Sequence, residues 1–485
     1  MHSSGAVERH DVVVVGAGAA GLYAALRAAA EGAAVALVSA TPLAQTASYW
    51  AQGGLAAALA DDDSPELHLA DTEAAGRGLV RHSAAMVLVT EAPDRVRFLE
   101  GLGMRFDADR HGRLALGLEG GHSVRRVVHA GGSATGRRLV RQLSALAAES
   151  PRIAVREGAR ARAIWVADGR CAGVLLEDGR ALRARATVLA TGGAAALWSR
   201  TTNPPGSQGT GMLLAHLAGA DLADLELLQF HPTAVTGVPG REGFLITEAI
   251  RGEGATLHDR DGERFVDELA PRDEVSRAIA ERLAATGARS VELDMTAIDP
   301  AAFPNVVAAL REAGLDPARE RVPVAPAAHY MMGGVVVDLM ARSSLPGLYA
   351  VGETSCTGLH GANRLASNSL SECIVFAERA VASALAEPAD GPLAPAADSI
   401  ELPELTREMR EQLWQLAGIV RTGEGLSELR ASAHPLVRLV ASCALTRRES
   451  RGAHARLDFP ERDDSFDGRH VVVDATGAET VTAWL

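Results

Sequence analysis

Three stretches of the chain combine histidine, arginine, hydroxyl and acidic side chains with loop glycines. The first is Leu118-Glu-Gly-Gly-His-Ser123, which is followed by Arg125, Arg126 and His129. The second comprises Gln229-Phe-His-Pro-Thr233, Thr247-Glu248, Arg251-Gly-Glu-Gly254 and Pro271-Arg-Asp273. The third comprises His329-Tyr330, Gly333-Gly334, Gly358-Leu-His-Gly-Ala-Asn-Arg364 and Ser367-Asn-Ser369. Such residues make a poor apolar core, so the three stretches together predict a polar functional site.

The arginines indicate which ligand such a site would take. A guanidinium group is a fixed cation whose planar fork grips a carboxylate through two hydrogen bonds, so the stretches suit a small dianionic substrate. For any single histidine or arginine, an ordinary structural hydrogen bond explains the residue equally well. No metal site is predicted, because His231 and His329 lie far apart and no His-x₃-His pair or carboxylate set accompanies them.

A glycine-rich turn near the N-terminus predicts a dinucleotide site. The apolar run from Asp11 to Val15 is typical of a buried strand, and it leads into Gly16-Ala-Gly-Ala-Ala-Gly21, a helix to about Ala30 and a second strand over 34–38. In such a βαβ unit the helix N-terminus offers free N–H groups and a positive dipole to a pyrophosphate.

Three features favour FAD over NAD as that nucleotide. Ser39-Ala40 end the second strand, where an NAD-binding fold often carries an acidic residue for the ribose. Thr187-Val-Leu-Ala-Thr-Gly-Gly193 and Gly347-Leu-Tyr-Ala-Val-Gly-Glu353 are further strands that end in glycine turns. Segments spread in this way over the chain are typical of flavoproteins with a split nucleotide-binding fold.

The order of the segments predicts an α/β protein. Residues 1–224 and 330–391 would form a split Rossmann-like FAD-binding domain, and 225–329 an inserted α+β capping domain over the nucleotide. A linker is expected around Pro388, Pro392, Pro395 and Pro403. Residues 397–485 would form a C-terminal helical domain, because 404–451 shows helical spacing of apolar residues.

Composition excludes several classes of function. With 485 residues, 47% hydrophobic and 22% charged, the chain is expected to be a soluble globular protein of about three domains. All 48 basic residues are arginine, which excludes Schiff-base lysines and P-loop lysines. The net charge of −13, without a basic block, argues against nucleic-acid binding. Neither a signal peptide nor a membrane span is expected, and four separated cysteines indicate a reducing cytoplasm: Cys171, Cys356, Cys373 and Cys443.

From about Asp11 to Pro460, the ordered motifs resemble those of one flavoprotein family. This family comprises the flavoprotein subunits of succinate dehydrogenase and fumarate reductase together with the L-aspartate oxidases. Besides the segments above, the resemblance rests on Ala51-Gln-Gly-Gly54 and Glu449-Ser-Arg-Gly-Ala-His454. The oxidase branch is favoured by Ala47, which stands where the dehydrogenase subunits attach FAD through a histidine, and by Glu119, where they lack an acid. The short stretch between Arg264 and Arg272 also resembles the oxidases.

The resemblance implies roles for individual residues. Non-covalent FAD would be bound by Gly16, Ala17, Gly18, Ala19, Gly21, Ser39, Ser48, Gln52, Gly53, Gly54, Thr191, Gly192, Glu353, Ser369 and Leu370. The substrate would be held by Gln229, His231, Thr247, His329 and Arg364, with Glu119 on its ammonium group. Arg272 would be the acid/base residue, with Glu248 and Arg251 as its proton relay. Arginine is a poor base at a pKa above about 12, so in oxidation Arg272 would serve mainly as an electrostatic clamp.

The activity implied is hydride transfer from Cα of L-aspartate to flavin N5, which gives iminoaspartate for NAD (quinolinate) biosynthesis. Oxygen or fumarate would reoxidise the flavin, and quinolinate synthase is a candidate partner. The alternative is a soluble fumarate reductase or succinate dehydrogenase flavoprotein subunit. A non-catalytic flavin-binding or RNA-modifying scaffold is disfavoured by the acidic charge. Thr210 and Ala40 replace an aspartate and a lysine common in the oxidases, so weaker FAD binding is expected.

Overall fold

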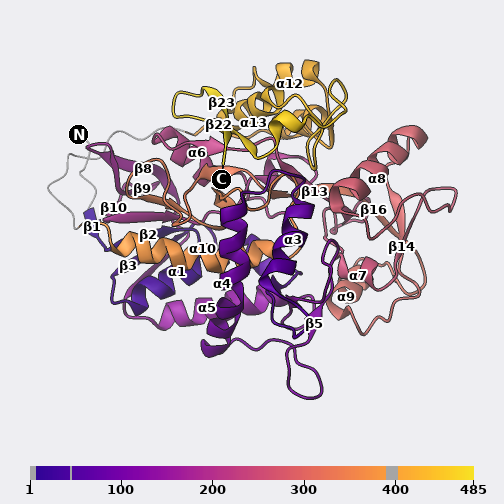
Figure 1. The fold of residues 1–485 in the computed structure, drawn as a ribbon, viewed down its shortest axis with the longest axis horizontal. Coiled ribbons are helices and arrows are strands. Elements are labelled where there is room, and N and C mark those ends of the chain that lie inside the picture. Colours follow the sequence, from indigo (N-terminus) through magenta and orange to yellow (C-terminus); the bar gives the residue numbers. More distant parts are fainter. Residues whose placement is uncertain (1–6, 44–45, 389–401, 485) are drawn as a thin grey trace.

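A five-stranded parallel sheet lies at the centre of the computed structural model, which describes residues 7–43, 46–388 and 402–484 (Figure 1). Its strand order is β18 (Leu348–Ala350), β11 (Ala186–Leu189), β2 (Val12–Val15), β3 (Val35–Ser39) and β7 (Ile153–Glu157). The chain moves outward from β2 first to one edge of the sheet and then to the other. The order therefore reverses between β2 and β11, and nucleotides bind at the carboxyl ends of strands beside such a reversal.

Both faces of this sheet are covered, which explains the uninterrupted valine run of β2. Val12 and Val14 face a core formed with four helices, α1 (Ala19–Ala30), α4 (His82–Gly101), α5 (Thr135–Glu149) and α10 (Asn368–Leu385). Val13 and Val15 face a second core, because neighbouring side chains of a strand point to opposite faces. That core contains side chains from a second sheet of four strands: β1 (Val7–Arg9), β10 (Ala181–Arg183), β9 (Arg170–Leu176) and β8 (Ala161–Ala167).

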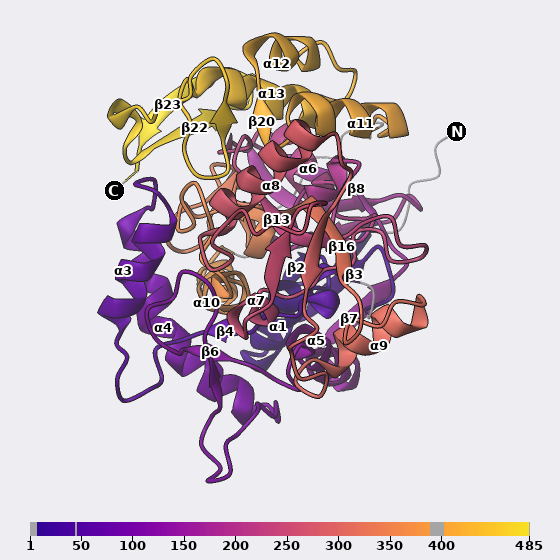
Figure 2. The same ribbon diagram turned by 90° about the vertical axis from the view of Figure 1, so that its right-hand side faces the viewer.

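A separate antiparallel sheet lies at the right of Figure 1 and faces the viewer in Figure 2. Its strands, in order, are β13 (Leu228–Val235), β16 (Val322–Met331), β15 (Val291–Asp294) and β14 (Thr256–His258). With α7 (Ala249–Gly252), α8 (Arg272–Thr286) and α9 (Pro304–Glu312) it encloses a core of its own. Residues near one end of β13 and β16, such as Phe230 and Ala328, belong instead to the core of the parallel sheet, so this sheet is anchored to it.

Shorter elements complete the region around the parallel sheet. A three-stranded sheet consists of β4 (Leu55–Ala56), β6 (Val127–Val128) and β5 (Leu116–Gly117). The remaining helices of this region are α2 (Ala47–Trp50), α3 (Pro65–Ala75) and α6 (Thr210–Leu217). No described helix is both long and apolar enough to cross a membrane.

The C-terminal segment contains both helices and strands, whereas the sequence pattern predicted helices. Its helices are α11 (Arg407–Leu416), α12 (Gly423–Leu429) and α13 (Pro435–Thr446), and a short parallel pair joins β20 (Val420–Arg421) to β21 (Ala455–Arg456). The hairpin of β22 (Arg469–Val473) and β23 (Glu479–Ala483) then adds to a sheet with β12 (Leu222–Ala223), β17 (Gly334–Val336) and β19 (Ser355–Cys356). The β-branched run of β22 favours a strand once a distant edge is present to pair with it. The expected linker residues Pro392 and Pro395 lie outside the described residues.

Buried ion pairs fix this segment to the rest of the molecule. The Arg447 guanidinium donates to Glu226 at 2.6 Å and to Glu449 at 3.1 Å, and all three side chains are fully buried. Nearby, His470 Nδ1 lies 2.5 Å from a carboxylate oxygen of Asp224. Removing one partner of a buried pair leaves an uncompensated charge. Because His470 lies in β22 and Asp224 follows β12, a shift of β22 along β12 would separate this pair, so the register of the two strands is strongly specified.

Candidate active site

The glycine turn after β2 has the shape of a pyrophosphate cradle. Gly16 has a φ of +109°, and a Cβ atom there would lie 2.1 Å from the carbonyl oxygen of Ala190 on the neighbouring loop. A Cβ atom on Gly21 would lie 1.9 Å from the Gly16 oxygen. Helix α1 begins at Ala19, and Gly18 before it provides no side-chain cap. The glycine turn therefore leads directly into the N-terminus of α1, where backbone N–H groups lack partners within the helix, as a phosphate-binding turn requires.

The other predicted cofactor residues surround this cradle. Ser48 on α2 accepts a hydrogen bond from Ala19 N at 3.1 Å, and Ser39 ends β3, where its hydroxyl donates to the Thr41 oxygen at 2.6 Å. Thr191 follows β11, and its Oγ1 lies 3.2 Å from Oγ1 of Thr354, which also donates to the Gly192 oxygen. The structure thus brings these predicted residues to the carboxyl ends of β2, β3 and β11.

Glu353, which follows β18, is a buried acid at the same edge. It accepts a hydrogen bond from Met331 N at 2.9 Å, and a Cβ atom on Gly193 would lie 2.1 Å from its Oε1 atom. Burial raises the pKa of Glu353 to about 7. Near neutral pH this side chain can therefore carry a proton and donate as well as accept, which suits it to a ligand with both kinds of polar group.

A second glycine segment, Gln52-Gly53-Gly54, continues the cofactor wall toward the polar residues. A Cβ atom on Gly54 would lie 2.3 Å from the Val128 oxygen, so only glycine fits there. Gln52 donates to the Leu245 oxygen at 2.8 Å, whereas its own Oε1 is buried without a partner. Ser369 and Leu370 lie in the first turn of α10. The residues present fit FAD, since they offer a glycine cradle, a helix N-terminus and an orphaned buried acceptor.

The predicted substrate residues converge beside this wall. Arg272, at the start of α8, donates from Nε to Glu248 Oε2 at 2.6 Å and from Nη1 to Gln229 Oε1 at 3.1 Å. Arg364 donates to the same Gln229 oxygen at 3.2 Å, and its guanidinium lies 4.7 Å from the centre of the Tyr330 ring. Two arginines that donate to one amide oxygen define a strongly cationic space.

The charges within this space are poorly balanced. Arg251 approaches Glu248 at 3.5 Å, so among the described contacts one carboxylate serves both Arg251 and Arg272. Burial would raise the pKa of Glu248, but Arg272 and Arg251 lower it to about 2. Burial and then Arg272 lower the pKa of Arg364 to about 10. Within the described part of the chain, Nε of Arg364 and Nε of Arg251 are buried without a hydrogen-bond partner. Orphaned donors of this kind favour an anionic ligand.

Two histidines line the same space. The rings of His231 and His329 lie 5.1 Å apart, and burial, reinforced by Arg272, lowers the pKa of each well below the usual value. Both are therefore neutral near pH 7. The Nδ1 atom of His231 accepts from Thr233 N at 3.3 Å, which leaves its proton on Nε2 for a ligand. Thr247 precedes Glu248 in the same loop and is also buried.

Thr202 and Asn203 were missed by the sequence analysis. Thr202 Oγ1 lies 2.7 Å from His329 Nδ1, and Asn203 donates to the His329 oxygen at 2.6 Å. Their Thr-Asn-Pro-Pro turn has the composition of an ordinary loop, so no signal in the sequence indicated contact with His329.

Glu119 enters from a different element, the loop after β5. Its side chain is 4% exposed, and Oε2 accepts a 2.6 Å hydrogen bond from the hydroxyl of Ser367. A Cβ atom on Gly53 would lie 3.6 Å from Glu119 Oε1, and one on Gly120 would lie 2.0 Å from Glu248 Oε1. The Glu119 loop thus lies between Gly53 of the cofactor wall and Glu248, the carboxylate that pairs with Arg272.

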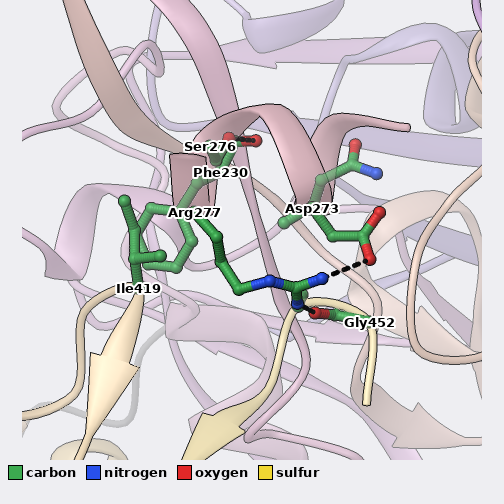
Figure 3. Close-up of a pocket in the computed structure, with 8 residues that line it drawn as sticks. Phe230, Asp273, Ser276, Arg277, Ile419 and Gly452 are labelled. Atoms are coloured by element: carbon green, nitrogen blue, oxygen red, sulfur yellow. Dashed lines mark hydrogen bonds and ion pairs between the residues drawn. The ribbon is translucent and has the colours of Figure 1, made fainter. Parts of the chain in front are cut away.

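Ion pairs behind α8 fix the residue that follows Arg272. Asp273 accepts from Arg77 at 3.3 Å and from Arg277 at 3.4 Å, and Arg277 also donates to the Gly452 oxygen at 2.7 Å (Figure 3). Gly452 in turn packs on the loop of Arg364, since a Cβ atom there would lie 2.3 Å from the Ala362 oxygen. The C-terminal segment therefore supports the backbone next to Arg272 and the loop that carries Arg364.

His68 on α3 forms a hydrogen bond with Asn368 on α10, and its burial makes the stability of the folded state depend on pH. Its Nε2 lies 2.8 Å from Asn368 Oδ1, and burial lowers its pKa from 6.5 to about 4. The folded state therefore leaves His68 neutral while the unfolded chain takes up a proton below pH 6.5. This contribution to stability is complete above pH 6.5 and falls as the pH approaches 4, by on the order of 3 kcal/mol.

We expect His68→Gln, which keeps an N–H donor toward Asn368, to remove that component. Because only wild type loses stability through His68 in acid, the thermal midpoint of the variant relative to that of wild type, measured from pH 8 down to pH 4, should rise as the pH falls. A midpoint difference that is constant across this range would contradict the assignment.

Comparison with family models and relatives identifies the family of this chain. The FAD binding domain model matches residues 11–370, and the fumarate reductase flavoprotein C-terminal model matches 432–483. The L-aspartate oxidase of Caulobacter vibrioides is 47% identical, with 93% of this chain and 94% of that protein covered. The chain belongs to the L-aspartate oxidase family. FAD is accordingly its cofactor.

Other relatives place this family within its superfamily. The L-aspartate oxidase of Streptomyces coelicolor is 43% identical over 96% of this chain and 91% of its own. A quinol-fumarate reductase solved with menaquinol is 30% identical, with a TM-score of 0.88 and 98% of each chain covered. Sdh1 of Mycobacterium smegmatis is also 30% identical, with a TM-score of 0.85 over 99% of this chain and 95% of that chain. Oxidases and reductases of this superfamily thus share the fold, which confirms the predicted fold class.

Proposed function

We propose that this chain oxidises L-aspartate to iminoaspartate with FAD, the first step of NAD biosynthesis through quinolinate. The observation that carries this proposal is Glu119, a buried carboxylate beside an arginine-rich space, with one oxygen that accepts no hydrogen bond among the described contacts. Such a site matches a dicarboxylate that also bears a cation. Succinate and fumarate lack that cation, whereas aspartate carries it as the α-ammonium group.

Recognition of the two substrate carboxylates is assigned to the convergent donors. Arg364 and Arg272, which both donate to Gln229, supply charged hydrogen bonds, and charged bonds are roughly twice as strong as neutral ones. The neutral imidazole of His231 adds a directed N–H without adding a charge that Glu248 would have to balance. The orphaned Nε of Arg364 fits the same role.

FAD, held by the glycine cradle and the residues around it, would serve as the two-electron oxidant for the Cα–H bond of the substrate. The chain holds the substrate by both ends so that Cα presents one face to the cofactor wall. Glu248 stays ionised at a pKa of about 2 and keeps Arg272 paired and oriented as a clamp. When fumarate is reduced, Arg272 is the proton donor, and Glu248 and Arg251 restore its proton.

The substrate residues come from two different parts of the chain. We propose that residues 1–224 and 330–391 hold FAD and that residues 225–329 cap it. The cap supplies Gln229, His231, Thr247, Glu248 and Arg272, whereas Arg364 and Glu119 come from the FAD-binding part. Closing the two parts on each other therefore completes the substrate site.

The alternative is a fumarate reductase or succinate dehydrogenase flavoprotein subunit. For such a subunit a buried Glu119 is unfavourable, because an uncharged methylene group offers no partner to the carboxylate oxygen that Ser367 leaves free. Oxygen or fumarate as the final electron acceptor, and quinolinate synthase as the consumer of iminoaspartate, belong to this same proposal.

Product analysis of the FAD-loaded protein tests the proposed activity. With L-aspartate in air, we expect oxaloacetate and ammonia in equal amounts, since both arise when iminoaspartate hydrolyses. Fumarate formed from succinate, without oxaloacetate from aspartate, would reject this proposal in favour of the alternative.

A further inference from the structure

We propose that Ser367 is a specificity-positioning residue that acts through Glu119 on the substrate ammonium group. This inference rests on the function proposed above and extends it to a residue that does not itself contact the dicarboxylate. It follows from the hydrogen bonds of the Ser367 hydroxyl, from its backbone conformation and from the state of the Glu119 carboxylate.

The hydroxyl of Ser367 has a single orientation. Its oxygen accepts a hydrogen bond from Gly54 N at 3.0 Å and lies 2.6 Å from Glu119 Oε2, and the residue is 5% exposed. A backbone N–H can only donate and a carboxylate can only accept. The single hydroxyl proton therefore points at Glu119, in a short, charge-assisted hydrogen bond.

The hydroxyl is held in place by an energetically unfavourable backbone conformation of Ser367. Ser367 has a φ of +61°, a left-handed conformation that is rare for residues other than glycine, asparagine and aspartate. It is retained because the Ser367 oxygen accepts from Ala56 N at 3.3 Å while α10 begins at the next residue. Unfavourable conformations of this kind gather at functional sites, where the surrounding structure enforces them.

As a consequence, Oε2 of Glu119 is engaged by Ser367, whereas Oε1 is available to a ligand. Among the described residues, Glu119 Oε1 lies 4.0 Å from the Nε2 atom of His129, which is beyond hydrogen-bond distance. The terminal torsion of a glutamate side chain is intrinsically broad. Ser367 removes that freedom, because it fixes Oε2 and thereby aims Oε1. Ser367 thus links the cofactor wall at Gly54 to the group that distinguishes aspartate from succinate.

Removing the hydroxyl should therefore affect one substrate and spare the other. For FAD-loaded Ser367→Ala, we expect KM for L-aspartate to rise about tenfold, the loss of roughly one charged hydrogen bond. KM for fumarate, measured in fumarate reduction by the same preparation, should change less than twofold. Ser367→Gly also lacks the hydroxyl but accepts a positive φ without strain, so it should give the same difference even if Ala is poorly tolerated.

Two comparisons separate positioning from a general structural effect. In a Glu119→Gln background, Ser367→Ala should change KM for L-aspartate less than twofold, because the effect passes through the missing charge. The matched control is Ser371→Ala, which removes another buried hydroxyl of α10, one that donates to the Ala56 oxygen at 2.7 Å. This control should leave both KM values within twofold of wild type.

The possible outcomes are distinct. Equal rises in KM for aspartate and fumarate, or a full effect that persists beside Glu119→Gln, would overturn the role of Ser367 and leave the proposed function intact. A wild-type holoenzyme that reduces fumarate but does not oxidise L-aspartate would instead reject the proposed function and this inference with it.

Discussion

Glu119→Gln is expected to lower kcat/KM for L-aspartate by about 10²- to 10³-fold, as loss of one partner from a desolvated charge pair typically does. Glutamine has nearly the same shape and can still accept the bond from Ser367, so the change removes charge with little change in packing. Fumarate lacks the ammonium group, and its reduction should change no more than about threefold. Steady-state kinetics in both directions on one preparation would measure the difference.

A suitable control for this variant is Glu8→Gln. Glu8 pairs with Arg156 at 2.6 Å at the far edge of the molecule, in strand β1, so its charge should not affect either substrate. Equal losses of aspartate and fumarate turnover in Glu119→Gln would show that Glu119 supports the loop rather than the ammonium group.

Arg364→Leu is expected to raise KM for every dicarboxylate, aspartate and fumarate alike, by about 10²- to 10³-fold. The guanidinium group is buried, lies over the Tyr330 ring and has an Nε without a partner among the described residues, so a leucine leaves the substrate carboxylate without its charged partner. Arg364→Lys should recover only part of the loss, because an ammonium group keeps the charge but not the planar fork. The flavin content should be measured alongside, since Arg364 contacts one predicted FAD residue, Ser369.

An unchanged KM in Arg364→Leu would mean that the dicarboxylate binds elsewhere. The FAD-loaded variant should first be compared with wild type by its visible spectrum. This comparison separates loss of substrate binding from loss of cofactor, because Arg364 also donates to Ser369 at the start of α10.

The nucleotide-binding half of the fold followed closely from local sequence. The valine run, the glycine turn at Gly16 and the strand at 186–189 each show a local pattern, and the structure aligns them side by side in one sheet. The hairpin at the C-terminus shows where local patterns fail. β22 becomes a strand because β12, about 250 positions earlier, offers an edge, and such a distant pairing leaves no periodic trace nearby.

The candidate site shows the same difference between residues that local sequence indicates and contacts that depend on distant packing. The clustering of Arg272, Arg364 and Glu248 was indicated by residue types that suit an apolar core poorly, and the structure brings these residues together. The partners that orient them, such as Thr202 for His329, lie in loops of ordinary composition. Their contacts depend on how β13 and β16 dock on the parallel sheet, which no single segment encodes.

The most direct test of the whole account is the visible spectrum of the purified yellow protein, recorded without oxygen before and after addition of L-aspartate and, separately, of succinate. We expect bleaching of the flavin by aspartate and not by succinate, with all flavin released by acid because Ala47 offers no covalent attachment. Bleaching by succinate alone would contradict it and assign the chain to the dehydrogenase branch.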